Sequence, residues 1–514
     1  MPYSSHNEPT VFAPQTAQKG AESPVSYRFP ALELLECSPS EKTVQDDSTT
    51  QKTILEVLEN AGLKAEIQTV HQGASVCRYD LAVTGKVTMR RLEAIEDELF
   101  FRFMSQGKIR LTFDPSSAAQ LRIELPKEKR SVLSLRGLLE EEAWNTATSA
   151  LTVALGRDLD GAPVLADLSK LPHLLIAGCA GSGRTVMMDS LLLSLLYRNT
   201  PEQLRLLLID PTQVEFASYN NLPHLLLPVI HQCKQAVAAL NWVVAEMDRR
   251  YALLASVGAR DLKGYNRLVN DHPPAQALAP IVIAINELDD LMLVAFRETE
   301  DVLCRIAQKG RAAGIHLVLS VQNTQKKVFT PLLKANIPSR LSLKLITMAD
   351  SKTVLDCTGA EGLLDKGDAL YLPVGAMTPL RLQGAYISYE EVQRVTDFLR
   401  QANGPKDCFD EVLLTALRQE AAKKTPKSKT NLPSPTEEQE GEDPLLNEAI
   451  ELAIANGSIS TSILQRRLTV GYGRAAKLID RMEQMGIIGP PEGQKPRTVL
   501  IDAEKWAKTG KNNL

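Results

Sequence analysis

One glycine-rich octapeptide, Gly178–Thr185 (GCAGSGRT), constrains the fold of this chain more than any other segment. It fits the phosphate-loop pattern G-x-x-x-x-G-K-[S/T] at every position except the lysine, which is Arg184 here. The apolar run His173–Ala177 precedes the loop, and the largely apolar stretch Thr185–Leu196 follows it. A buried strand, a tight loop and a buried helix are therefore predicted in succession, with the backbone N–H groups of the loop facing an anion.

The side chains of this loop predict how a bound nucleotide is held. A hydroxyl at the position of Thr185 ligates Mg²⁺ in such loops. Arg184 brings a wide, planar guanidinium where the pattern has a compact ammonium between the β- and γ-phosphates. The sequence thus predicts nucleotide binding and leaves open whether the γ-phosphate is handled productively. The residues expected around the phosphates are Gly178, Gly181, Ser182, Gly183, Arg184 and Thr185.

A second polar motif lies downstream, where the apolar run IVIAI ends in Asn286 and Glu287. In many P-loop ATPases such a strand ends in Asp-Glu, of which the aspartate helps to hold Mg²⁺ and the glutamate polarises the attacking water. Asn286 keeps the shape of the aspartate, and we expect it near the metal beside Thr185, but it lacks the charge that favours a dication. Asp289 and Asp290 either compensate for that charge or begin a solvated helix.

Strands and helices alternate between residues 131 and 405, which is typical of a parallel sheet covered by helices on both faces. The clearest strands are continuous apolar runs, as expected when both faces of a sheet are buried. We therefore predict an α/β domain of the P-loop NTPase, RecA-like type. The runs are His173–Ala177, Leu204–Ile209, Ile281–Ile285 and His316–Ser320.

Changes in composition divide the chain into further segments. Residues 1–45 are rich in Ser, Thr, Pro, Gln and Glu and lack periodicity, which predicts a disordered leader. Residues 46–130 show an order of helices and strands that predicts a small α+β domain before the P-loop domain of residues 131–405. Residues 419–442 predict a flexible linker, after which residues 443–503 resume a compact helical pattern.

Charge, cysteine content and the length of apolar runs limit the surroundings of the chain. The formal net charge of −4 excludes a uniformly basic surface, so any nucleic-acid contact has to come from a local patch. Seven dispersed cysteines without a C-x-x-C pair indicate reduced thiols in a cytoplasm. No signal peptide is evident, and no apolar run approaches the about 20 residues of a membrane span. We expect a cytoplasmic protein without a transmembrane segment.

The C-terminal segment predicts a winged helix, because three short helices are followed by a strand-like pair of segments. Its third helix carries Arg474, Lys477 and Arg481 at a spacing that places the three charges on one face. Arg466, Arg467 and Tyr472 add donors near the start of that helix, which suits contacts with phosphates. The alternative is a basic face that is merely solvated.

Residues 131–400 resemble the motor domain of the FtsK/SpoIIIE family of DNA translocases. The resemblance extends over nearly the whole domain, and the C-terminal segment RRLTVGYGRAAKLIDRMEQMGII resembles the γ domain of the same family. The preceding α+β domain resembles the α region of that family only loosely. The matching motor segments include SALTVALGRDLDGAPVLADLSKLPHLLIAG, LLLIDPTQVEFASYNNLPHLLLPV, CRIAQKGRAAGIHLVLSVQ and GAEGLLDKGDALYLPVGA.

The family resemblance implies ATP and Mg²⁺ at the interfaces of a hexameric ring that threads double-stranded DNA. It implies a role for Glu287 at the attacking water and for Gln322 as a polar sensor at the end of its strand. A ring ATPase also needs an arginine from the neighbouring subunit, for which Arg340 is the first candidate and Arg311 the second. Either one could instead be an ordinary interface or surface arginine. The chain departs from the usual residues of the family at Arg184 and Asn286. It also departs where the family has Asp-Pro-Lys and Thr-Gln-Arg-Pro, since Thr212 replaces that lysine and Asn323 and Thr324 replace the last two residues of the second motif.

Three functions follow from these observations. The first is an ATP-dependent translocase of duplex DNA in chromosome segregation, cell division or DNA transfer, built as a homo-hexamer or a mixed ring. The second is a structural or partner subunit that binds nucleotide and DNA but has lost ATP hydrolysis. The third is a secretion-type ATPase of the same superfamily, against which the winged helix argues.

Overall fold

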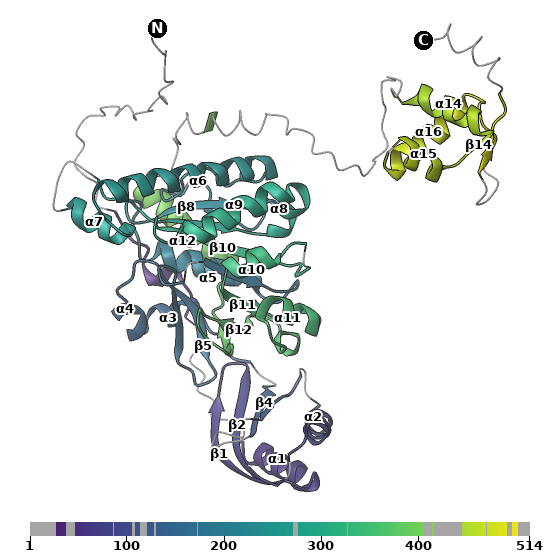
Figure 1. Cartoon of the computed structure of the whole chain (residues 1–514). Coiled ribbons are helices and arrows are strands. Elements are labelled where there is room, and N and C mark those ends of the chain that lie inside the picture. Colours follow the sequence, from purple (N-terminus) through teal and green to yellow (C-terminus); the bar gives the residue numbers. More distant parts are fainter. Residues whose placement is uncertain are drawn as a thin grey trace. The chain divides into compact units, whose positions relative to one another are not determined.

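The computed structural model describes most of the chain, in two compact units that comprise Met1–Lys424 and Thr425–Leu514 (Figure 1). The predicted linker, residues 419–442, and most of the predicted leader lie outside the described residues. Within the described ranges, no helix combines the length and apolarity needed to cross a bilayer. Those ranges are 27–37, 47–85, 87–104, 108–113, 121–127, 130–171, 173–270, 276–325, 327–404, 409, 414–415, 445–468, 470–490 and 496–501.

The first described domain, residues 47–127, is the predicted α+β fold. Its antiparallel sheet has the strand order β1-β2-β4-β3, and two helices supply the apolar side chains that cover it. Ile54 and Leu58 of one helix and Ile95 and Leu99 of the other are buried against the strands. The elements are α1 (Ser48–Asn60), β1 (Lys64–Gln72), β2 (Val76–Thr84), α2 (Met89–Phe103), β3 (Arg110–Phe113) and β4 (Leu121–Pro126).

The central domain, residues 130–404, is built on a nine-stranded sheet with the order β6-β5-β13-β12-β11-β7-β10-β9-β8. The stretch from β11 to β8 is parallel, and β12, β13, β5 and β6 extend it in antiparallel fashion. The sheet is therefore mixed. Short hairpin connections join β5 to β6 and β12 to β13, as antiparallel neighbours permit. The strands are β5 (Thr152–Asp158), β6 (Pro163–Asp167), β7 (His173–Ala177), β8 (Arg205–Ile209), β9 (Ile281–Ile285), β10 (Ile315–Val321), β11 (Ser339–Leu343), β12 (Asp368–Leu372) and β13 (Leu380–Gly384).

Helices cover both faces of this sheet, which explains the continuous apolar strands (Figure 1). Leu174 and Ile176 of β7 point into a core shared with α5 and α12, whereas Leu175 and Ala177 point into a core shared with α6 and α9. The helices are α3 (Leu135–Leu139), α4 (Glu142–Thr146), α5 (Arg184–Leu196), α6 (Cys233–Ser256), α7 (Leu262–Asn270), α8 (Leu288–Val294), α9 (Phe296–Lys309), α10 (Pro331–Asn336), α11 (Met348–Leu355) and α12 (Tyr389–Asn403), with short 3₁₀ turns at Ala217–Tyr219 and Ala360–Gly362.

Residues 27–37 contradict the prediction of a disordered leader over residues 1–45. They contain a 3₁₀ turn at Leu32–Leu34, and the next residue, Leu35, is buried in the core of the central domain. The Glu36 backbone N–H donates to the Glu391 carboxylate at 2.7 Å, which fastens the segment to α12. Leucines embedded in a polar stretch supply this anchor, and the polar composition around them hid it from the sequence prediction.

The second unit contains the three predicted helices. The first strand of its small sheet, Ser458–Ile459, lies between the first two helices and was not predicted. Apolar side chains such as Ile450, Leu464 and Met482 from each helix form its core. Ile488 bridges Val499 next to the β14–β15 pair, so residues 497–499 lie beside the segment that follows the third helix. The elements are α14 (Leu446–Asn456), β14 (Ser458–Ile459), α15 (Thr461–Leu468), α16 (Tyr472–Gln484) and β15 (Arg497–Thr498).

Candidate nucleotide-binding site

The glycine-rich loop connects β7 to α5 in a conformation that only glycine adopts without strain. Gly181 and Gly183 have φ values of 76° and 102°. A Cβ atom on Gly183 would lie 2.8 Å from the backbone nitrogen of Gly367, so the loop packs directly against the segment before β12. The Ser182 hydroxyl is buried and has no hydrogen-bond partner among the described residues. The loop and the first turn of α5 therefore fit a phosphate chain in shape and in available donors.

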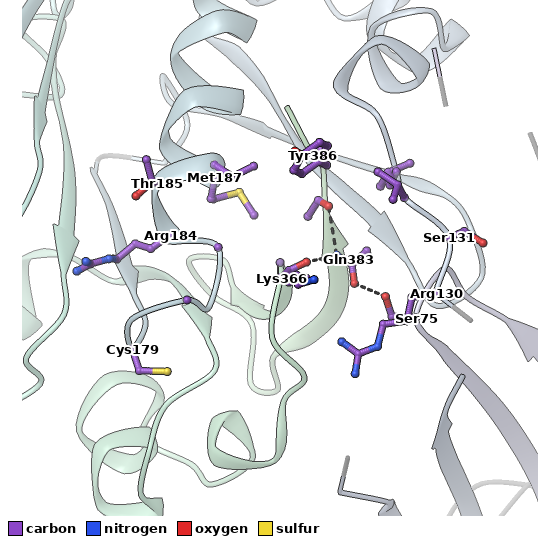
Figure 2. Close-up of a pocket in the computed structure, with 18 of the residues that line it drawn as sticks. Ser75, Arg130, Ser131, Cys179, Arg184, Thr185, Met187, Lys366, Gln383 and Tyr386 are labelled. Carbon is purple, nitrogen blue, oxygen red and sulfur yellow. Dashed lines mark hydrogen bonds between the residues drawn. The ribbon is translucent and has the colours of Figure 1, made fainter. Parts of the chain in front are cut away.

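A cavity of about 700 Å³ begins at this loop. Gly181, Gly183 and Thr185 line one part of it, whereas Gln383 and Tyr386 from the end of β13 line another (Figure 2). The volume lies within the roughly 300–1,000 Å³ of pockets that enclose small ligands. The structure thus places the predicted phosphate contacts at the wall of a cavity that could also accommodate the rest of a nucleotide.

Arg184 belongs to the lining of this cavity, but its side chain extends away from Gln383 and Tyr386 (Figure 2) and contacts the second polar motif. Its guanidinium forms an ion pair with the Glu287 carboxylate, in which one of the two hydrogen bonds measures 3.2 Å. It also donates to Gln322 Oε1 at 3.1 Å. The Arg184 and Glu287 side chains are only 9% and 18% exposed. The residue that replaces the pattern lysine therefore holds the expected water-activating carboxylate and the expected sensor together.

Strand order brings these three residues to one place. β10 lies between β7 and β9, and all three strands are parallel, so their carboxyl ends share one edge of the sheet. Arg184 begins α5 after β7, Gln322 follows β10, and Glu287 follows β9 by two residues. Glu287 has a φ of 48°, a left-handed conformation that is uncommon for a non-glycine residue. Ligand sites of open α/β sheets lie at this edge.

Asn286 and Asp289 are both engaged by neighbouring groups. The Asn286 side-chain amide donates to the buried Asp210 at 3.3 Å, and Asp210 also accepts from the Thr212 hydroxyl at 2.6 Å. Asp289 accepts the Gln322 backbone N–H at 2.8 Å, and burial raises its pKa to about 6. Asp289 is buried, so it does not begin a solvated helix, and its carboxylate is occupied by backbone N–H groups rather than free to replace a metal ligand at position 286.

Glu215 and Asp210 are acidic neighbours of the loop that the sequence prediction did not single out. Burial raises the pKa of Glu215, and a hydrogen bond with the Thr185 side chain opposes that rise. Asp210 is fully buried at the end of β8. The segment DPTQVE contains both residues, so a count of carboxylates after each strand could have found them.

Arg340 does not have the surroundings of an arginine that reaches a neighbouring subunit. Its guanidinium donates to Asp356 at 2.7 Å and to the carbonyl oxygens of Val354 and Lys334 at 3.2 and 3.0 Å, all within its own domain. The residue is only 7% exposed. These contacts favour the second candidate over Arg340. The second candidate, Arg311, is exposed in the turn before β10.

The predicted DNA-binding residues gather on two helices of the C-terminal unit. Arg466 and Arg467 are exposed at the end of α15. Arg474 and Lys477 are exposed on α16, and Arg481 one turn further donates to Gln484 at 3.3 Å. Tyr472 begins α16, but its side chain lies outside the described residues.

The strand order and the geometry of the glycine-rich loop place this chain among the P-loop ATPases. Comparison with protein families identifies which family of P-loop ATPases the chain matches. Residues 134–326 match the FtsK/SpoIIIE family, residues 29–127 match the FtsK alpha domain, and residues 440–502 match the Ftsk gamma domain. The chain belongs to the FtsK/SpoIIIE family.

Curated relatives align with almost the entire chain. DNA translocase SftA of Bacillus subtilis (strain 168) is 41% identical over 490 residues, which are 95% of this chain and 49% of the relative. DNA translocase FtsK of Caldanaerobacter subterraneus subsp. tengcongensis is 40% identical over 485 residues, 94% of this chain and 65% of the relative. DNA translocase FtsK of Clostridium acetobutylicum is 38% identical over 487 residues, 94% of this chain and 61% of the relative. The chain thus spans half to two thirds of the length of these relatives.

Proposed function

We propose that this chain is an ATP-driven translocase of double-stranded DNA that acts in the cytoplasm as a hexameric or mixed ring. The observation that carries the proposal is the succession of alpha, FtsK/SpoIIIE and gamma regions in one chain, as in relatives named DNA translocases. The exposed cations of α15 and α16 support DNA binding through phosphates. Chromosome segregation, cell division and DNA transfer are the processes that such an activity serves.

Each residue of the site has a role under this proposal. The N–H groups of the glycine-rich loop hold the phosphates, and the Thr185 hydroxyl and Asn286 stand on the metal side. Mg²⁺, when bound, supplies charge that offsets the phosphate oxygens. Glu287 orients the attacking water once Arg184 releases the Glu287 carboxylate. Gln322 loses its hydrogen bond from Arg184 in the same movement. Arg311 of a neighbouring subunit is the candidate for balancing the developing negative charge.

A second function is favoured by the ion pair between Arg184 and Glu287. A carboxylate held by a guanidinium is a poor acceptor for a proton from water, and Asn286 lacks the charge of the usual aspartate. A chain with these features could bind nucleotide and DNA as a structural or partner subunit without turning ATP over. The secretion-type alternative would require that the C-terminal unit does not bind DNA.

Duplex-stimulated ATP hydrolysis distinguishes these functions. We expect the full chain with Mg²⁺ to hydrolyse ATP faster when duplex DNA is present and to displace a triplex-forming strand from that duplex. Glu287→Gln should abolish both activities, whereas Glu298→Gln, an exposed glutamate of α9, should change neither. If the wild type is inactive and Arg184→Lys with Asn286→Asp restores turnover, the partner-subunit function is correct. If the chain shows no salt-sensitive duplex binding, the secretion-type function regains support.

A further inference from the structure

The cavity beside the glycine-rich loop extends well beyond the phosphate contacts. Its far part is formed by the connector between the two domains of the first unit, residues 130–133, and by the end of β13 (Figure 2). Gly181, Gly183 and Thr185 of the loop line the same cavity. One molecule with a phosphate end and a second, bulkier end could therefore occupy it.

Tyr386 is held at this far end by the backbone of the connector. Its N–H donates to the Leu133 carbonyl at 2.6 Å, and its carbonyl accepts from the Leu135 N–H at 3.1 Å. The side chain nevertheless remains 51% exposed, and that of the neighbouring Val132 remains 60% exposed. A firmly anchored backbone thus presents an aromatic ring and an aliphatic side chain that are about half exposed.

Gln383 of β13 lies three residues before Tyr386, and its side-chain amide already has hydrogen-bond partners within the protein. Gln383 Oε1 accepts from the Ser75 hydroxyl at 2.6 Å, and Gln383 Nε2 donates to the Lys366 carbonyl at 2.9 Å (Figure 2). Both ends of this amide are used within the protein, so its orientation is fixed. Arg130 and Ser131 of the connector also line this end, and Arg130 donates to the Asp365 carbonyl at 3.3 Å. Beside these polar residues, Tyr386 and Val132 offer a planar, apolar face to a ligand.

We propose that Tyr386 is the aromatic surface on which the base of the bound nucleotide stacks, with Val132 beside it. The inference rests on the nucleotide binding proposed above and deepens it. Every nucleobase offers a π face, and stacking on an aromatic side chain is worth about 1–3 kcal/mol, or roughly 5- to 150-fold in affinity. The phosphate chain lies on the glycine-rich loop, and the base lies where the connector and β13 meet.

Titration calorimetry of the full chain with Mg²⁺ and either ATP or tripolyphosphate tests the inference, because tripolyphosphate lacks the base. We expect Tyr386→Ala to weaken ATP roughly 5- to 150-fold without changing the affinity for tripolyphosphate. Tyr386→Leu, which keeps apolar bulk, should also weaken ATP, and Tyr386→Phe should restore it. Tyr389→Ala is the matched control, because Tyr389 is 55% exposed nearby but does not line the cavity.

Three results would overturn the inference without refuting the proposed nucleotide binding. Tyr386→Ala and Tyr386→Leu could bind ATP as the wild type does. Both variants could lose ATP and tripolyphosphate equally, which would indicate damage to the loop. The wild type could bind ATP no more tightly than tripolyphosphate. If the wild type binds neither ligand, the proposed nucleotide binding itself fails, and the base contact fails with it.

Discussion

Removal of the Arg184 guanidinium should destabilise the nucleotide-free protein, because it leaves the Glu287 carboxylate unpaired in a largely buried position. The Arg184 guanidinium donates three hydrogen bonds, two to the Glu287 carboxylate and one to Gln322 Oε1. Breaking a buried ion pair by removing one partner costs about 3–5 kcal/mol. Since the Glu287 side chain keeps 18% of its surface exposed, we expect Arg184→Met to cost about 3 kcal/mol, the lower end of that range.

A double-mutant cycle separates the ion pair from other effects of the substitution. Glu287→Gln keeps a neutral acceptor for the guanidinium, so it should cost about 1–2 kcal/mol. In the Glu287→Gln background, Arg184→Met should cost about 1–2 kcal/mol less than in the wild type. Arg184→Lys should lie between wild type and Arg184→Met, because one ammonium cannot serve all the acceptors at once.

Denaturant unfolding followed by tryptophan fluorescence is a suitable assay, since Trp144 and Trp242 both lie in the central domain. Arg249→Met is the matched control. Arg249 has a side chain that is 55% exposed and pairs with Glu246 on α6. Glu246 keeps Arg250 as a second partner, so loss of the exposed Arg249 should cost about 0–1 kcal/mol. The reasoning would be refuted if Arg184→Met cost no more than the control, or cost the same with and without the Glu287 charge.

Three further predictions concern other parts of the chain. Burial raises the pKa of Asp189 to about 7, so the folded state binds the carboxyl proton more tightly than the unfolded state does. Thermal stability should therefore fall as the pH rises from about 4 to 7, and Asp189→Asn should flatten that profile. Arg381→Met removes the cation that pairs with the buried Glu124 of β4 and Asp368 of β12, and it should cost about 3–5 kcal/mol, with faster hydrogen exchange in β4 as a second readout. Lys477→Ala should lower the salt dependence of duplex binding by about 0.9 in the log–log slope, and an unchanged slope would exclude a phosphate contact.

The strands of the central domain could be predicted from the sequence because their signal is local. A continuous apolar run such as His173–Ala177 is required wherever both faces of a sheet are covered, and β7 and β9 have the predicted bounds. The glycine-rich loop is equally local, since its positive φ values and its helix follow from adjacent residues. The antiparallel strands beyond β11 include charged residues such as Arg157, Asp368 and Arg381. They are not continuous apolar runs, which is why the mixed sheet was not predicted.

The contacts of Arg184 could not be predicted from the sequence. The octapeptide determines that position 184 carries a cation beside a phosphate-binding loop, but not which way that cation points. Glu287 lies 103 residues away and Gln322 lies 138 residues away, and they meet Arg184 only because β10 is inserted between β7 and β9. The contacts of Arg340 depend on packing in the same way, because its partners come from the segments before and after β11.

By itself, then, the sequence determined the P-loop architecture, the order of the regions and the residue types available at the site, because periodicity and turn chemistry act over a few residues. The tertiary structure alone decided which of those side chains are paired, which are buried and which remain accessible. Charges and hydrogen bonds act over a few ångströms, and only the strand order brings residues far apart in the chain within that distance. Whether Glu287 is free or held by Arg184 is a property of this packing.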